Sequence, residues 1–170
     1  MHTKTRTLCA KALIIFSMIA PISAPVAASA ANDSSFVAHY TTASLSAQEQ
    51  KAGNLLNSDR AAYGQPPLVI DPALSRIARI KSEDMRDIQY FAHTSPTYGS
   101  VRDMLTRFGY PYKAAGENIA NHATIEKSQA ALISSPGHRR NILSTAYTKV
   151  GIGVALDKNG FVYLTQIFAR

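Results

Sequence analysis

The chain has 170 residues, 46% of them hydrophobic and 17% charged, so it is long enough for one domain with a sizeable core and is neither disordered nor collagen-like. Lys and Arg number 18 against 11 Asp and Glu, which gives a formal net charge of +7. A single cysteine excludes a disulfide framework.

The N-terminal segment, residues 1–30, has the pattern of a signal peptide. Lys4, Arg6 and Lys11 form a positive leader, and residues 12–20 (ALIIFSMIA) form an apolar run that is too short to span a bilayer. An A-x-A cleavage pattern ends this segment at Ala30. The pattern predicts a secreted or periplasmic protein. The alternative is an N-terminal membrane anchor, against which the short apolar run argues.

The predicted mature chain, residues 31–170, has 15 basic and 11 acidic residues, a net charge of +4, and no cysteine. An exported chain without disulfides must be stabilised by its apolar core. The mild positive charge is ordinary for a soluble protein, although it could also favour anionic cell-surface polymers. We expect no stable membrane span in the mature chain. It also lacks a basic stripe with interleaved aromatic residues, so we do not expect it to bind nucleic acid.

Residues 31–44 are small, polar and aperiodic and predict a flexible leader, so the folded domain is expected over 45–170. A capping box, Ser46 with Glu49, begins the first predicted helix, and Gly64 ends it. Residues 68–70 predict a brief strand.

A second helix begins at Asp71-Pro72 and carries one apolar stripe. Lys81 interrupts this stripe, and we expect its stem to lie along the stripe with the amine outside. Residues 89–99 predict a loop, and Ser100 with Asp103 caps a third helix.

The C-terminal half begins with a candidate strand over 116–120, followed by short helices from Thr124 and from Ser135-Pro136. Residues 150–156 alternate large apolar residues with small ones, and 161–168 form a second β-rich run after a Lys-Asn-Gly turn, which predicts a hairpin. The glycines of the first run, Gly151 and Gly153, are expected to allow close packing against a neighbouring element. Helices followed by a terminal hairpin predict an α+β fold with helices packed on an antiparallel sheet.

Three separate segments each carry one residue able to bind a metal or move a proton: His93 in 91–96 (FAHTSP), Glu117 in GENIA, and His138 in 135–143 (SPGHRRNIL). Two histidines and a carboxylate suffice to hold zinc with an open fourth position, or to act as an acid and base set. Each residue also has a structural explanation. A buried Glu117 would need a partner such as a cation, a histidine or backbone N–H groups.

His138 is also the third helical position if Ser135 caps its helix, in which case the Ser135 hydroxyl would accept the His138 backbone N–H. The positive end of the helix dipole disfavours imidazolium and would keep His138 neutral.

In their order along the chain, these motifs resemble the CAP superfamily of cysteine-rich secretory, antigen 5 and pathogenesis-related 1 proteins, in its cysteine-free bacterial branch. The matching segments are LLNSDR at 55–60, PPLVIDPAL at 66–74, SEDM at 82–85, YFAHTSP at 90–96, GENIA at 116–120, SPGHRRNIL at 135–143, VGIGVA at 150–155 and YLTQIF at 163–168. The resemblance implies an α-β-α sandwich with a small central antiparallel sheet flanked by helices. It also implies a cleft where two His and up to two Glu converge, sometimes around zinc.

Position by position, His93 and His138 match the two family histidines and Glu117 matches the glutamate of the GENI segment. The second family glutamate has no clear counterpart. Glu126 lies 12 residues before His138, about 18 Å along a continuous helix, so we do not expect it at the site. Leu132 replaces the Trp of the bacterial pattern W-x-x-S-x-x-H, which removes an aromatic wall.

Three functions follow from these observations. The first is an exported binding module for a lipid, cell-envelope or protein ligand at His93, Glu117 and His138, with zinc as a possible cofactor. The second is a peptidase or cell-wall hydrolase in which Glu117 or a histidine activates water, with or without zinc. The third is a passive envelope protein. Binding is favoured over catalysis because a shared fold does not establish activity. A mature chain without cysteine excludes thiol catalysis.

Overall fold

The computed structural model describes residues 44–170, so the predicted signal peptide (1–30) and all but the last residue of the predicted leader (31–44) lie outside the described residues. The described part contains five helices and four strands, which follow one another as α2 (Ala47–Ala62), β1 (Val69–Ile70), α3 (Pro72–Asp87), α4 (Val101–Arg107), β2 (Ala115–His122), α5 (Ile125–Ser134), α6 (Pro136–Leu143), β3 (Lys149–Leu156) and β4 (Val162–Ala169). None of these helices is long and apolar enough to traverse a bilayer.

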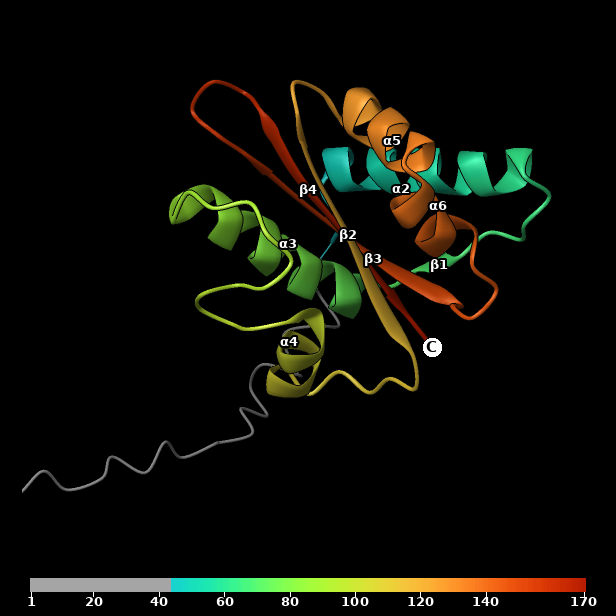
Figure 1. Cartoon of the computed structure of the whole chain (residues 1–170), viewed down its shortest axis with the longest axis horizontal. Coiled ribbons are helices and arrows are strands. Elements are labelled where there is room, and N and C mark those ends of the chain that lie inside the picture. Colours follow the sequence, from blue (N-terminus) through green and yellow to red (C-terminus); the bar gives the residue numbers. More distant parts are fainter. Residues whose placement is uncertain (1–43) are drawn as a thin grey trace, which may run out of the picture. The chain divides into compact units, whose positions relative to one another are not determined.

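The strands form one sheet in the order β1-β3-β4-β2. The three long strands are antiparallel, as the sequence predicts, while the two-residue β1 pairs parallel with β3, so the sheet as a whole is mixed. Helices α3 and α4 cover one face, and α2, α5 and α6 cover the other (Figure 1). The α+β class and the α-β-α sandwich are therefore confirmed.

Alternation along the strands gives each face of the sheet its own apolar core. The core under α2, α5 and α6 includes Leu56, Leu132, Ile142, Ile152, Leu164 and Phe168. The core under α3 and α4 includes Leu74, Ile77, Ala78, Met104, Leu105 and Ile167.

Helix α3 lies directly against the glycines of β3. A Cβ atom built on Gly153 would lie 2.0 Å from the Ala78 carbonyl carbon, and one on Gly151 would lie 2.3 Å from that of Leu74. Any larger side chain would collide with helix backbone, which cannot rotate away. The prediction that these glycines permit close packing is thus confirmed, and their partner is α3.

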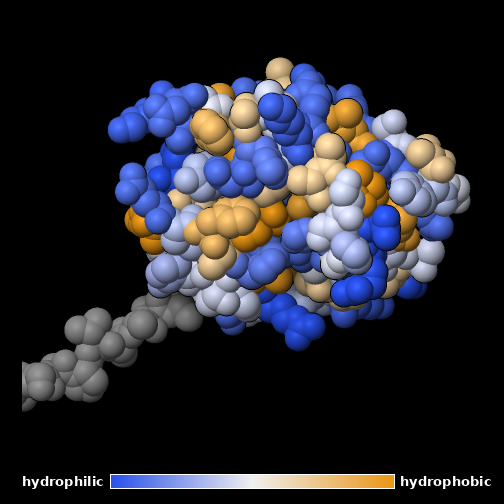
Figure 2. All heavy atoms as spheres, turned by 45° about the horizontal axis from the view of Figure 1, so that its top comes forward, coloured by the Kyte–Doolittle hydropathy of each residue, from blue (hydrophilic) through white to orange (hydrophobic). Residues whose placement is uncertain are grey.

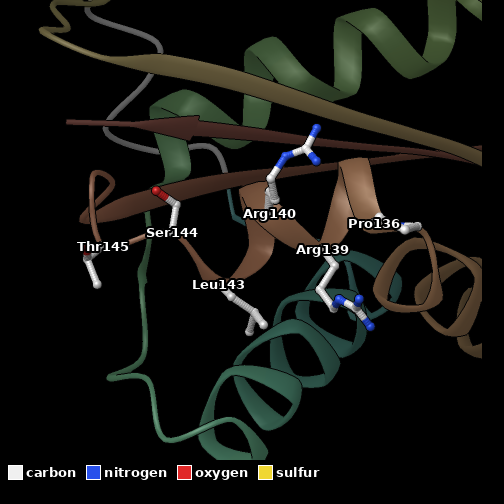
Figure 3. A pocket seen from close by; sticks show the side chains of 6 residues that line it. All are labelled: Pro136, Arg139, Arg140, Leu143, Ser144 and Thr145. Carbon is white, nitrogen blue, oxygen red and sulfur yellow. The ribbon is translucent and has the colours of Figure 1, made fainter.

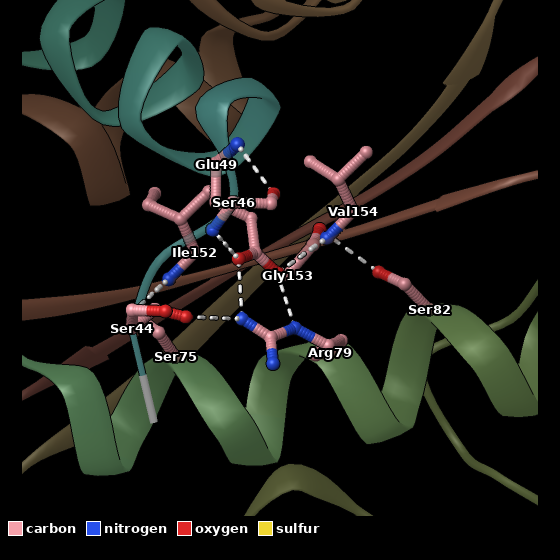
Figure 4. A network of polar contacts seen from close by, with 9 residues as sticks. All are labelled: Ser44, Ser46, Glu49, Ser75, Arg79, Ser82, Ile152, Gly153 and Val154. Carbon is pink, nitrogen blue, oxygen red and sulfur yellow. Dashed lines mark hydrogen bonds and ion pairs between the residues drawn. The ribbon is translucent and has the colours of Figure 1, made fainter. Parts of the chain in front are cut away.

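Because α3 lies so close, its serine side chains form hydrogen bonds with the backbone of β3 beyond the two residues that pair with β1 (Figure 4). The Ile152 N–H donates to Ser75 Oγ at 3.0 Å, and Ser82 Oγ donates to the Gly153 carbonyl at 3.0 Å. An exposed strand edge would otherwise pair with other chains, so these contacts protect the sheet.

Glu49 links α2, α3 and β3 (Figure 4). Its fully buried carboxylate completes the predicted capping box with Ser46, accepts two bonds from Arg79 and lies 3.4 Å from the Val154 N–H. Hydrogen bonding to Glu49 raises the pKa of Arg79. A residue predicted only as a helix cap therefore also holds two helices and a strand together.

Candidate functional site

Three elements bring the sequence-predicted residues together. His93 lies in the loop between α3 and α4, Glu117 lies in β2, and His138 lies in the first turn of α6. The His93 Nδ1 and Glu117 Oε1 atoms are 2.7 Å apart, and the His93 and His138 ring centroids are 6.4 Å apart with the rings tilted by 39°. The two histidines and the carboxylate therefore belong to one site.

Glu117 and His93 differ strongly in their exposure to solvent. The Glu117 side chain is 4% exposed, whereas the His93 side chain is 57% exposed. The second carboxylate oxygen, Glu117 Oε2, is buried and has no hydrogen-bond partner among the described residues. The buried Glu117 carboxylate thus holds the solvent-exposed His93 imidazole through one oxygen. Its other oxygen makes no hydrogen bond among the described residues.

The two imidazoles have opposite electrostatic environments. The hydrogen bond to Glu117 raises the pKa of His93 above its ordinary value, whereas burial and the nearby His93 lower the pKa of His138. Glu117 therefore favours the charged form of His93, while burial favours the neutral form of His138. Such divergence separates a proton donor from a proton acceptor.

Lys81 positions the loop that carries His93. Its side chain is fully buried, and its Nζ donates to the Tyr90 hydroxyl at 3.1 Å, the Ala92 carbonyl at 2.8 Å and the His93 carbonyl at 3.0 Å. Burial lowers the pKa of this amine. The expectation that the Lys81 amine lies outside is wrong, because the loop folds back over α3 and supplies oxygen partners for it.

Asp84, one turn further along α3, holds the same loop. Its carboxylate accepts hydrogen bonds from Ser95 Oγ and Thr97 Oγ1, both at 2.7 Å, and from the Tyr90 hydroxyl. Ser95 Oγ in turn accepts two backbone N–H groups of the loop. Lys81 and Asp84 thus fix the His93 loop to a helix that is itself packed tightly on the sheet.

A chain of buried carboxamides holds the other two site residues. Asn118 donates to the His138 carbonyl at 3.1 Å, and Asn141 donates to the Glu117 carbonyl at 3.2 Å and to Asn118 Oδ1 at 2.9 Å. Each asparagine therefore holds the backbone of one site residue.

The same chain continues away from the site and into the core. Asn118 also donates to Gln166 Oε1, Gln166 donates to Gln129 at 2.7 Å, and Gln129 donates to Asp59 of α2 at 2.6 Å. Because each buried amide is satisfied, the network specifies one arrangement of β2, β4, α5 and α6.

Sequence patterns did not identify Lys81, Asp84 or the two glutamines as site-supporting residues. The lysine in an apolar helical stripe was the one usable signal for Lys81, and Asp84 lies within the family-like SEDM segment. Nothing in sequence spacing joins Gln129 to Gln166, because tertiary folding alone brings them together.

Glu126 and Ser135 were the two other residues considered near this site. Glu126 is half-exposed at the start of α5 and forms an ion pair with Lys51 of α2, which lowers its pKa to about 2. Ser135 occupies the N-cap position of α6, but its side chain makes no capping hydrogen bond, so the expected bond to the His138 N–H is wrong.

A pocket of about 640 Å³ lies along α6 and the residues that follow it, lined by Pro136, Arg139, Arg140, Leu143, Ser144 and Thr145. Figure 3 shows the guanidinium groups of Arg139 and Arg140 pointing in opposite directions. This divergence does not suit joint capture of one anion by the two guanidinium groups.

Imidazole nitrogens are donors that zinc accepts, and this site offers two of them. His93 and His138 are the residues able to hold a zinc ion, with Glu117 behind His93 as the carboxylate that orients a metal-bound histidine. Over residues 44–170, no three His, Cys, Asp or Glu side chains form a ready-made metal-binding group. Zinc ligation by His93, Glu117 and His138 stays a prediction.

Residues 54–168 match the CAP family, described as the cysteine-rich secretory protein family. The chain belongs to the CAP family. The Bacillus subtilis protein YkwD is 45% identical over 128 residues, covering 75% of this chain and 49% of YkwD. The B. subtilis membrane protein YlbC is 35% identical over 123 residues, covering 72% of this chain and 34% of YlbC. This CAP chain spans about half or less of the length of these curated relatives.

Solved structures share the CAP architecture. An extracellular Bacillus anthracis protein containing an SCP domain superimposes with a TM-score of 0.66 at 35% identity, over 72% of this chain and 40% of that one. An outer surface protein of Borrelia burgdorferi gives 0.65 at 15% identity, over 71% of this chain and 90% of that one, and at this identity it supports the fold alone.

Proposed function

We propose that this chain is an exported CAP protein that binds a ligand at the site formed by His93, Glu117 and His138. Export is supported by the signal-peptide pattern of residues 1–30 and by the extracellular description of the B. anthracis relative. The ligand belongs to the cell envelope or its surroundings: a lipid, an envelope polymer or a protein.

The single observation that carries the proposal is the 2.7 Å contact between an exposed His93 imidazole and a buried Glu117 carboxylate. A charge buried without a partner is costly, so Glu117 is retained in the core only with His93 held against it. Glu117 contacts His93 through Nδ1, and the ring centroid of His93 lies 6.4 Å from that of the half-buried His138. A ligand there meets a hydrogen-bond donor and an acceptor side by side.

Zinc is the proposed cofactor of this site. When bound, zinc would supply a Lewis acid for an oxygen of the ligand. His93 would bind through Nε2 because Glu117 occupies Nδ1, and both imidazoles would have to be neutral. Because Glu117 raises the pKa of His93, protons compete with zinc for this imidazole more strongly than for an ordinary histidine.

The test uses the chain purified after export, with zinc titrated by calorimetry and with purified peptidoglycan sacculi and phosphatidylglycerol vesicles as sedimentation probes. The double variant His93→Ala, His138→Ala should lose zinc and at least one of the two probes. His122→Ala is the matched control, because His122 is an exposed histidine at the end of β2. Equal binding by wild type and the double variant would contradict the proposal.

Hydrolysis is the second candidate, and the divergent pKa shifts of His93 and His138 favour it. In this reading His138 accepts a proton from water and His93, charged against Glu117, donates one to the leaving group. Peptide, ester and peptidoglycan substrates, each with and without zinc, provide the assay. Turnover that is lost in the double variant would support catalysis, and no turnover on any substrate would end this candidate.

A further inference from the structure

We propose that this protein carries a second binding site, for an uncharged saccharide, in a pocket between the end of α3 and the β3–β4 turn. This hairpin pocket has a volume of about 520 Å³, which lies within the range of small-ligand sites. Its lining residues are Arg86, Asp87, Gln89, Tyr90, Phe91, Asp157, Lys158, Asn159 and Tyr163. The proposal goes beyond the function proposed above and does not depend on it.

Exposed apolar side chains gather at this end of the molecule. Among the described residues, four of the six large hydrophobic side chains that are exposed belong to the two segments that meet here: Ile88, Phe91, Leu156 and Phe161. Figure 2 shows apolar side chains open to solvent between hydrophilic ones on the face that it turns toward the viewer. Of these four residues, Phe91 lines the pocket, and the other three lie within two residues of a lining residue in the sequence.

The aromatic residues of the pocket suit the faces of sugar rings. Phe91 is 52% exposed, and Tyr90 and Tyr163 line the same pocket from the loop and from β4. Aromatic rings offer large rigid apolar surfaces at low entropic cost, and the tyrosine hydroxyl adds a polar contact. The C–H face of a pyranose ring presents the complementary surface.

The charges of the pocket balance. Arg86 is paired with Asp87 at 2.7 Å, and the turn contributes one acidic and one basic residue, Asp157 and Lys158. Two positive and two negative groups give no preference for an ionic ligand. Arg86 and Asp87 bond to each other, and Asp157 Oδ1 accepts two N–H groups of the turn. The carboxamides of Gln89 and Asn159 provide donors and acceptors for hydroxyl groups, which a purely apolar lipid chain would leave unsatisfied.

Gln89 has a backbone conformation that its residue type does not favour. Its φ is 53°, and it is the one non-glycine residue with positive φ among those described. Gln89 directly follows Ile88, the C-cap residue of α3, and glycine is the usual residue at such a position. The backbone N–H of Tyr90, the next residue, donates a hydrogen bond to the Met85 carbonyl. A side chain at this position is explained if its carboxamide serves the pocket that it lines.

The hairpin pocket and the His93 site share the loop that Lys81 holds, because Tyr90 and Phe91 line the pocket and His93 follows two residues later. Tyr163 pairs with Asn121 of β2, four residues beyond Glu117, which is about 13 Å along the strand. The two sites thus share a loop but no lining residue, and the β4 side of the pocket lies away from Glu117.

The experiment is an NMR titration of the purified chain with two neutral oligosaccharides, the tetramers of N-acetylglucosamine and of glucose. We expect shifts confined to 86–91 and 157–163. Phe91→Ala should weaken binding at least tenfold, while Tyr63→Ala, which removes an equally exposed aromatic ring at the end of α2, should not. Gln89→Gly should weaken binding without lowering the Tm, since glycine accepts positive φ.

Three outcomes would overturn the proposal: no shifts at about 10 mM of either saccharide, equal affinity of Phe91→Ala and wild type, or binding of phosphatidylglycerol vesicles or an acidic peptide in this pocket instead. The variant His93→Ala, His138→Ala should keep full saccharide affinity. Failure of the hairpin pocket is thus distinguishable from failure of the His93 site.

Discussion

Replacing Gly153 with alanine tests the role of the close contact between α3 and β3. The added Cβ would lie 2.0 Å from the Ala78 carbonyl carbon, 2.2 Å from its oxygen and 2.2 Å from the Arg79 nitrogen. Ordinary van der Waals contact between carbon atoms is about 3.5–4.0 Å. Helix α3 must therefore move away from the sheet by about 1.5 Å.

Such a displacement disturbs more than one contact. Overpacking a core by one methyl group costs about 1–3 kcal/mol, and this collision is with backbone and not with a flexible side chain. The hydrogen bond from Ser82 to the Gly153 carbonyl lengthens as well, at about 1 kcal/mol. We expect Gly153→Ala to lower the free energy of unfolding by about 2–4 kcal/mol.

Urea denaturation followed by circular dichroism measures this change. Gly137→Ala is the matched control, because Gly137 lies within α6 and a Cβ there meets nothing within 4 Å. Alanine should stabilise that helix by about 0.5–1 kcal/mol. A Gly153→Ala protein within about 1 kcal/mol of wild type would refute the reasoning that β3 needs glycine under α3.

Three further predictions follow from the buried charges. Lys81→Met should keep the fold, since methionine fills the space of the stem, but amide exchange over residues 92–97 should accelerate about tenfold or more as the Nζ hydrogen bonds are lost. Glu49→Ala should lower the free energy of unfolding by about 3 kcal/mol or more in thermal or urea denaturation, because it leaves Arg79 and a strand N–H without their partner. Since Glu117 raises the pKa of His93, the stabilisation from this pair is complete below a pH of about 6.5 and is lost as pH rises through the raised pKa. Urea denaturation at several pH values should show that Glu117→Gln removes this pH dependence, and an unchanged profile would contradict it.

Local signals in the sequence predicted much of the fold. The caps at Ser46, Asp71, Ser100 and Thr124 each form as expected, because a capping bond depends only on residues within one turn. The hairpin forms as well, with its turn held by the Asp157 carboxylate. The parallel pairing of β1 could not be foreseen, since two residues carry no directional pattern.

The site was predicted only as far as its three polar residues. Their residue types and the family resemblance selected His93, Glu117 and His138, but no spacing rule indicates that Glu117 contacts His93 and not His138. The environment of Lys81 was misjudged for the same reason. Burial of its amine depends on carbonyl groups of a loop about eleven residues away, which only the folded chain places above the helix.

The contact between His93 and Glu117 is the basis of the proposed site, and NMR titration of the imidazole nitrogens tests it most directly. We predict that wild-type His93 carries its proton on Nδ1 and titrates above about 6.5, that His138 titrates below it, and that Glu117→Gln returns His93 to the ordinary value or lower. A His93 that titrates at the ordinary value in the wild type, or that keeps its titration unchanged in Glu117→Gln, would contradict the account.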